Sequence, residues 1–258
     1  MWTIRQEQTE AFRQHHLRKF EDEMVEHSKQ VAPVLCKLIG DEHVRLTAQR
    51  GITQSQAYGF TNRGPIRLFI ELKLLFGSSF DTDPQYSWAA ATLRGPDHEM
   101  SRAEALRGKT LEYQQKVSGP DAINTYEALK KLAVLAKHPL SFSAEDCVPG
   151  MLREMARVFP QKSSYVGERA LTVLVNRGIS EARKREFLPP RGDLLLVSLM
   201  FAFGHGCTSD PLYPWIARTL NDERITSPAA RAERLEKKAL TWLSHVLAPP
   251  LEEQRNGA

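Results

Sequence analysis

The chain contains an internal repeat, and this feature constrains its fold more than any other. When residues 24–93 are placed over residues 151–220, at a constant offset of 127 and without a gap, 19 of the 70 aligned positions are identical. Chance alone would give about 4 identities, at a random match rate of roughly 6%. The sequence therefore predicts one unit that was duplicated within the chain.

The identical positions fall in blocks, and we expect them to be needed for folding. We expect the shared aspartates to cap helices, the glycines at 77 and 204 to end helices, and the tryptophans to pack in the core. For the shared arginines we expect an ion pair with a carboxylate of a neighbouring helix. The repeat positions are Arg50, Gly51, Gly77, Asp83, Pro84 and Trp88 in the first copy and Arg177, Gly178, Gly204, Asp210, Pro211 and Trp215 in the second.

Apolar residues recur at helical spacing along most of the chain, whereas strand patterns are scarce. A long first helix is expected over residues 6–30. A second begins at Asp41, with Gly51 as a possible interruption, and Ser101 with Glu104 resembles a capping box that opens a helix toward Val117. Further helices are expected over residues 66–76, 121–137, 144–158, 167–187, 193–203, 210–220 and 227–247, and one beginning at Asp83-Pro84. The predicted fold is all-α, with two tandem related helical units packed as a pseudo-repeat.

Helix-breaking residues mark the expected boundary between the units. Ser118, Gly119 and Pro120 follow a charged helix and combine two residues that stop helices. We therefore expect a first helical unit over residues 1–119 and a second, divergent unit with a connecting helix over residues 120–250. The polar residues 251–258 are expected to form a flexible tail.

The composition argues against nucleic-acid and membrane partners. The net charge is only +4 and is spread over both halves, and the one basic cluster, residues 183–185, reads as a solvated helix face, whereas nucleic-acid binding needs a clustered basic surface. The apolar run over residues 194–203 is too short to span a bilayer, and the first residues resemble no signal peptide. We expect a cytoplasmic protein whose three widely spaced cysteines are reduced.

Few residues suggest covalent chemistry. His205 and Cys207, with Asp210 nearby, could form a nucleophilic site, because a cysteine needs a basic partner to become a thiolate. However, residues two apart rarely have that geometry, and the first copy carries different residues there. The equivalent positions are Ser78, Ser79 and Phe80. We predict a protein that is not an enzyme, with a site near His205 and Cys207 as the alternative.

No metal or cofactor site is expected. His15 and His16 are adjacent and point to different faces of a helix, so they cannot chelate one ion together. Glu23 and His27 are one helical turn apart, a spacing that is far more typical of a surface pair. The sequence also has no phosphate loop, paired-cysteine ligand set or dinucleotide fingerprint.

Several short motifs of the first copy resemble a family of small bacterial proteins encoded beside type VI secretion spike and effector genes. These motifs are Gly51-Ile52, Tyr58-Gly59, Phe80-Asp81, Asp83-Pro84 and Trp88-Ala89. The resemblance covers about residues 1–115. The second copy departs from it, with Arg185-Glu186 in place of the tyrosine-glycine pair and Cys207-Thr208 in place of the phenylalanine-aspartate pair.

The resemblance implies a role in secretion without implying an enzymatic activity. We expect a non-enzymatic protein that binds a secreted effector, most simply as a cytoplasmic immunity protein, with an effector-loading adaptor or chaperone as the alternative. Loops on a rigid scaffold usually carry specificity. The two divergent loops after the central helices are therefore the expected partner contacts, with plain solvent-exposed connections as the alternative. The expected contact residues are Ser78, Ser79, Phe80, Asp81, His205, Cys207 and Ser209.

Overall fold

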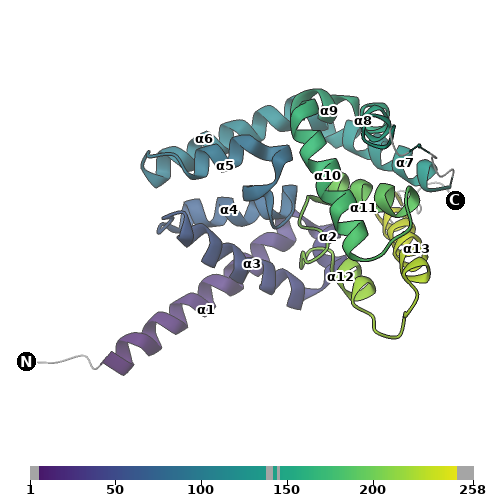
Figure 1. Ribbon diagram of the computed structural model, residues 1–258. Coiled ribbons are helices and arrows are strands. Elements are labelled where there is room, and N and C mark those ends of the chain that lie inside the picture. Colours follow the sequence, from purple (N-terminus) through teal and green to yellow (C-terminus); the bar gives the residue numbers. More distant parts are fainter. Residues whose placement is uncertain (1–5, 138–141, 144–145, 249–258) are drawn as a thin grey trace, which may run out of the picture.

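The computed structural model describes residues 6–137, 142–143 and 146–248, and in these residues it contains helices and no strand. The prediction of an all-α fold is therefore confirmed. Figure 1 shows α4, α5 and α6 together on one side of the molecule and α7, α8 and α13 on the other, with α10 between them. The first half of α1 extends away from the rest of the molecule (Figure 1). No helix among the described residues is both long and apolar enough to cross a membrane.

The first half of the chain forms six α-helices. Between α4 and α5 the chain makes two short 3-10 turns, Phe80–Thr82 and Pro84–Tyr86. After α6 a π-helical turn, Gln114–Ser118, leads to Gly119, which has a φ of 73°. The helices are α1 (Gln6–Val31), α2 (Pro33–Ile39), α3 (Asp41–Ala57), α4 (Arg63–Phe76), α5 (Ser87–Leu93) and α6 (Glu99–Tyr113).

The second half begins with a short 3-10 turn, Pro120–Ala122, and continues with seven helices. These helices are α7 (Ile123–Lys137), α8 (Cys147–Val158), α9 (Pro160–Val166), α10 (Glu168–Lys184), α11 (Arg191–Phe203), α12 (Pro214–Leu220) and α13 (Pro228–Val246). The bounds of α9, α10 and α12 lie 127 residues after those of α2, α3 and α5. The first residues of α6 and α13, at 99 and 228, are 129 apart. The predicted tail, residues 251–258, lies outside the described residues.

Gly51 does not interrupt α3, and in this respect the sequence prediction was wrong. The helix runs through Gly51 to Ala57. A Cβ atom at this position would lie 2.7 Å from Cγ1 of Ile70 on α4. At Gly178 on α10, a Cβ atom would lie 2.6 Å from Cγ2 of Val197 on α11. Both glycines therefore allow two helices to approach closely, which outweighs the cost of glycine inside a helix.

Other local predictions were also corrected. Ser101 lies inside α6, which begins at Glu99 after His98, because the Nδ1 atom of His98 accepts a hydrogen bond from the Met100 N–H. Arg50 and Arg177 are exposed, and within the described part of the chain neither makes an ion pair. The predicted arginine staples are therefore absent from these residues. The sequence analysis also missed the short helices α2 and α9.

Two similar aromatic clusters form much of the core. In the first half, the Phe76 ring centroid lies 4.5 Å from Tyr86 and 5.7 Å from Trp88. In the second half, the Phe203 ring centroid lies 4.5 Å from Tyr213, at the equivalent position. Trp215 also packs against this core, as Trp88 does in the first half. The shared aromatic residues are thus packing residues, as the sequence predicted.

Candidate functional site

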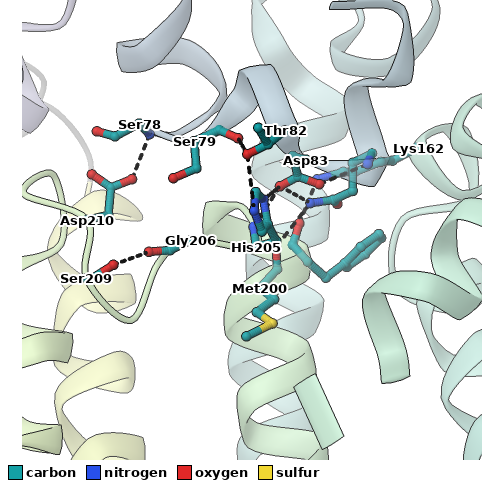
Figure 2. A network of polar contacts seen from close by, with 12 residues as sticks. Ser78, Ser79, Thr82, Asp83, Lys162, Met200, His205, Gly206, Ser209 and Asp210 are labelled. Atoms are coloured by element: carbon teal, nitrogen blue, oxygen red, sulfur yellow. Dashed lines mark hydrogen bonds and ion pairs between the residues drawn. The ribbon is translucent and has the colours of Figure 1, made fainter. Parts of the chain in front are cut away.

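The two loops expected to contact a partner face each other at the centre of the molecule, residues 78–82 after α4 and residues 205–209 after α11 (Figure 2). The Asp83 carboxylate accepts a hydrogen bond from the backbone N–H of His205, at 2.6 Å. The Asp210 carboxylate accepts one from the backbone N–H of Ser78, at 2.7 Å. Asp210 is 127 residues after Asp83, and His205 is 127 residues after Ser78. The same contact therefore occurs twice, once in each direction, and we call these two carboxylates the aspartate pair.

Two glycines allow the loops to come so close. Gly77 and Gly204 end α4 and α11 with φ values of 93° and 92°, which residues with a side chain rarely adopt. A Cβ atom on Gly77 would lie 2.6 Å from the backbone oxygen of Phe203. A Cβ atom on Gly204 would lie 3.1 Å from the backbone oxygen of Phe76. Each glycine thus ends its own helix, as predicted, and also lets the backbones of the two halves meet.

Each member of the aspartate pair also caps its own loop. The Oδ1 atom of Asp83 accepts from the Gln85 N–H at 2.8 Å, and the Oδ1 atom of Asp210 accepts from the Leu212 N–H at 2.9 Å. The predicted capping role is therefore present. The contact of each aspartate with the other half was not predicted, because no local sequence pattern signals a hydrogen bond between residues more than a hundred positions apart.

The two buried carboxylates have opposite electrostatic environments. Burial opposes ionisation of Asp83, but hydrogen bonds from His205 and Gln85 outweigh it and hold the Asp83 pKa below its usual value. The Nδ1 atom of His205 lies 3.2 Å from Oδ2 of Asp83, at ion-pair distance but without hydrogen-bond geometry. Asp210 faces Ser78 in place of a histidine, and burial raises its pKa. The fully symmetric backbone contact therefore joins two carboxylates that differ in charge stabilisation.

This difference predicts unequal effects of two isosteric substitutions. Asp83→Asn should lower the free energy of unfolding at pH 7 by about 1 kcal/mol more than Asp210→Asn, because Asp83 loses more hydrogen bonds to a charged acceptor. The sign follows from the pKa shifts. A lowered folded-state pKa stabilises above the unfolded value and loses this effect as the pH falls, whereas a raised one stabilises only at lower pH. Urea unfolding of both variants at pH 7 and pH 4 measures this. A larger loss for Asp210→Asn at pH 7 would contradict the assignment.

Two buried lysines border this region, and the sequence analysis did not identify them. The Lys73 ammonium donates to the backbone oxygen of Ser78 at 2.7 Å and also contacts Gln54. The Lys162 ammonium donates to the backbone oxygen of Phe201 at 2.6 Å (Figure 2). Burial lowers the pKa of each lysine to about 8. No hydropathy pattern marks these lysines as buried, because charged residues are rarely found in a core.

The structure does not support a thiolate at Cys207. The side chain is fully buried, and burial raises the pKa of its thiol. His205 contacts Asp83, and its Nε2 atom lies 3.4 Å from the Thr82 hydroxyl. No hydrogen bond joins His205 to the sulfur atom of Cys207 within the described residues. The pair therefore lacks the activated geometry that nucleophilic catalysis requires.

The loop residues also fail to form the free surface that the sequence analysis expected. Ser78, Phe80 and Asp81 are buried, as is Cys207. Ser79, His205 and Gly206 are only partly accessible, and a Cβ atom at Gly206 would lie 2.4 Å from the Ser79 hydroxyl. Thr82 and Ser209 are exposed. The prediction was wrong for the buried positions, because the two loops pack against each other.

The remaining candidates for charge or metal binding have structural partners. Glu23 pairs with Arg63, and His27 lies 2.6 Å from Glu71, so the predicted pair of Glu23 with His27 does not form. In the basic cluster, Arg185 binds Glu181 at 2.8 Å. The described residues contain no group of three or more side chains that could hold a metal ion.

An apolar groove on the outside of the first half is the remaining candidate surface. It lies between the end of α1, α4 and α6 and has a volume of about 410 Å³. Val31, Leu75 and Leu111 line it and are 50%, 48% and 53% exposed. Large aliphatic side chains that share one exposed groove are typical of a protein interaction surface. We call this the first-half groove.

Comparisons with protein-family models, curated proteins and solved structures gave no match for this chain.

Proposed function

We propose that this chain is a non-enzymatic protein-binding protein of a bacterial type VI secretion effector module, and that it acts in the cytoplasm as an immunity protein. The observation that carries the binding role is the first-half groove, where Val31, Leu75 and Leu111 expose aliphatic surface to solvent. The link to secretion rests on the resemblance of the first copy to proteins encoded beside spike and effector genes.

We further propose that residues 1–119 and 120–250 are two related units joined about the aspartate pair. The reciprocal hydrogen bonds of Asp83 and Asp210 support this proposal, since each carboxylate binds the loop of the other half. A scaffold joined in this way is preorganised, which reduces the entropy lost when a partner binds. Such a rigid surface suits an inhibitor that must block a toxin.

An effector-loading adaptor is the second candidate. It would use a similar surface but would release the effector at the spike. An enzyme with a site near His205 and Cys207 is a further alternative, and the burial of the Cys207 thiol argues against it.

The test is co-expression of the tagged chain with the products of its neighbouring genes, followed by purification and a toxicity assay. We expect one stoichiometric effector-like partner, together with growth rescue when the chain is present. Leu111→Asp should reduce both, whereas Met100→Asp, at an equally exposed position on α6, should not. A bound effector without growth rescue would favour the adaptor. The absence of any stoichiometric partner while the neighbours are expressed would overturn the proposed function.

A further inference from the structure

The second half contains a groove at the position equivalent to the first-half groove. The two grooves use matching positions of the central helices α4 and α11, displaced by 127 residues. They also use matching positions of α6 and α13, displaced by 129 residues, as are the first residues of these helices. On α4 and α11 the pairs include Leu68 and Leu195, Leu72 and Leu199, and Leu75 and Ala202. On α6 and α13 the pairs include Arg107 and Glu236, Thr110 and Ala239, and Leu111 and Leu240.

In the second half this groove is filled by a helix of the same chain. Leu132 and Leu135 of α7 lie between α8, α11 and α13, and they separate the groove into two small cavities of about 90 and 20 Å³. Ala128, Leu132 and Leu135 form the inward face of α7, at the i, i+4 and i+7 spacing of an amphipathic helix. The second-half groove is therefore a binding site for an amphipathic helix, and its occupant is α7.

In the first half the equivalent groove has no helix in it. The segment that would correspond to α7 lies before the end of α1, and there the chain continues as the extended first half of α1 (Figure 1). The consequence is visible at one matched pair of residues. Val158, beside α7, is 2% exposed, whereas the equivalent Val31 is 50% exposed. The first-half groove thus has the walls of a helix-binding site and lacks the helix.

The charge at the edge of the groove also differs between the halves. In the second half, Glu236 makes an ion pair with Arg191 at 2.7 Å. Arg107 takes the place of Glu236 in the first half, and Gly64 takes the place of Arg191. Within the described residues Arg107 makes no ion pair. An occupant of the first-half groove would therefore be favoured by an acidic residue near Arg107.

We propose that the first-half groove binds an amphipathic helix of the partner protein, with aliphatic residues at i, i+4 and i+7 and an acidic residue facing Arg107. The identity of this partner as a secreted effector rests on the proposed function. The preference of the groove for a helix rests only on its equivalence to the groove that α7 fills. Helix-in-groove binding of this kind is a common mode of peptide recognition.

The test uses a fluorescent peptide with the sequence of α7, residues 123–137, and the full-length chain. Binding is measured by fluorescence anisotropy. We expect saturable binding that weakens at least about tenfold with Leu111→Asp or Leu75→Asp, a loss equivalent to one buried aliphatic contact. Met100→Asp is the matched control, because Met100 is on α6, is as exposed as Leu111 and lies outside the groove. A peptide with Leu132→Asp and Leu135→Asp should not bind.

Two further measurements locate the peptide and its charge preference. Hydrogen exchange should show new protection over residues 68–75 and 107–114. Protection of α11 and α13 instead would mean that the peptide replaces the chain's own α7, although the tethered helix has the advantage of a high effective concentration. A peptide with Lys130→Glu and Lys131→Glu should bind the wild-type chain a few times more tightly, and Arg107→Glu should reverse this gain.

Three outcomes would overturn the proposal. They are the absence of saturable peptide binding, protection confined to the second half, and a dimer of the chain that Leu111→Asp disrupts, which would make a second copy the occupant. Failure of the proposed function is a separate result. If the peptide binds the first-half groove and no effector is recovered from co-expression, the helix-binding site stands and only the secretion role falls.

Discussion

Replacing Gly77 by alanine is expected to lower the free energy of unfolding by about 3–5 kcal/mol, which would leave little of the stability of an ordinary domain. The backbone at Gly77 has a φ of 93° and a ψ of 155°, a region used almost only by glycine. The new Cβ atom would also lie 2.6 Å from the backbone oxygen of Phe203, and a backbone atom cannot move aside as a side chain can. The two halves would have to separate at the aspartate pair.

Gly40 provides a matched control for this substitution. It has nearly the same backbone conformation, with a φ of 81° and a ψ of 160°, but no atom lies within 4 Å of a Cβ placed there. Gly40→Ala should therefore cost only the conformational strain, about 1–2 kcal/mol. Denaturant unfolding of both variants measures the difference. Equal losses for the two alanines would show that the contact between Gly77 and Phe203 does not contribute to stability.

Replacing Lys162 by methionine is expected to change how stability depends on pH. Burial lowers the pKa of this lysine from 10.5 to about 8, so the folded chain binds fewer protons than the unfolded chain between these values. Because the unfolded state binds more protons there, the wild-type stability contributed by Lys162 rises with pH across this window. Methionine has no such proton. Its stability relative to the wild type should fall by about 2 kcal/mol between pH 7.5 and pH 10.

The comparison of the two chains isolates Lys162, because the buried thiols and phenols titrate in both. Chemical unfolding at a series of pH values between 7.5 and 10 provides the measurement. Lys73→Met should show the same trend, since burial also lowers the pKa of Lys73 to about 8. A stability difference that stays constant over this range would contradict the buried, weakly compensated ammonium at position 162.

The sequence alone determined the features that depend on neighbouring residues. Helical spacing gave the all-α class, and glycine and proline placed the ends of α4 and α11 and the turn after Ser118. The capping role of Asp83 and Asp210 was also predicted, because a carboxylate before proline can accept from the next free amides. These effects operate within a few residues, so a local pattern is sufficient to recognise them.

Only the tertiary structure decided what these elements contact. Asp83 reaches His205 and Asp210 reaches Ser78 across 122 and 132 residues, and the same packing buries the loops that had been expected to face a partner. It also placed α7 in one of two equivalent grooves and left Arg107 at the edge of the other. Local patterns carry no record of which faces meet, because a buried contact depends on how two distant surfaces fit together.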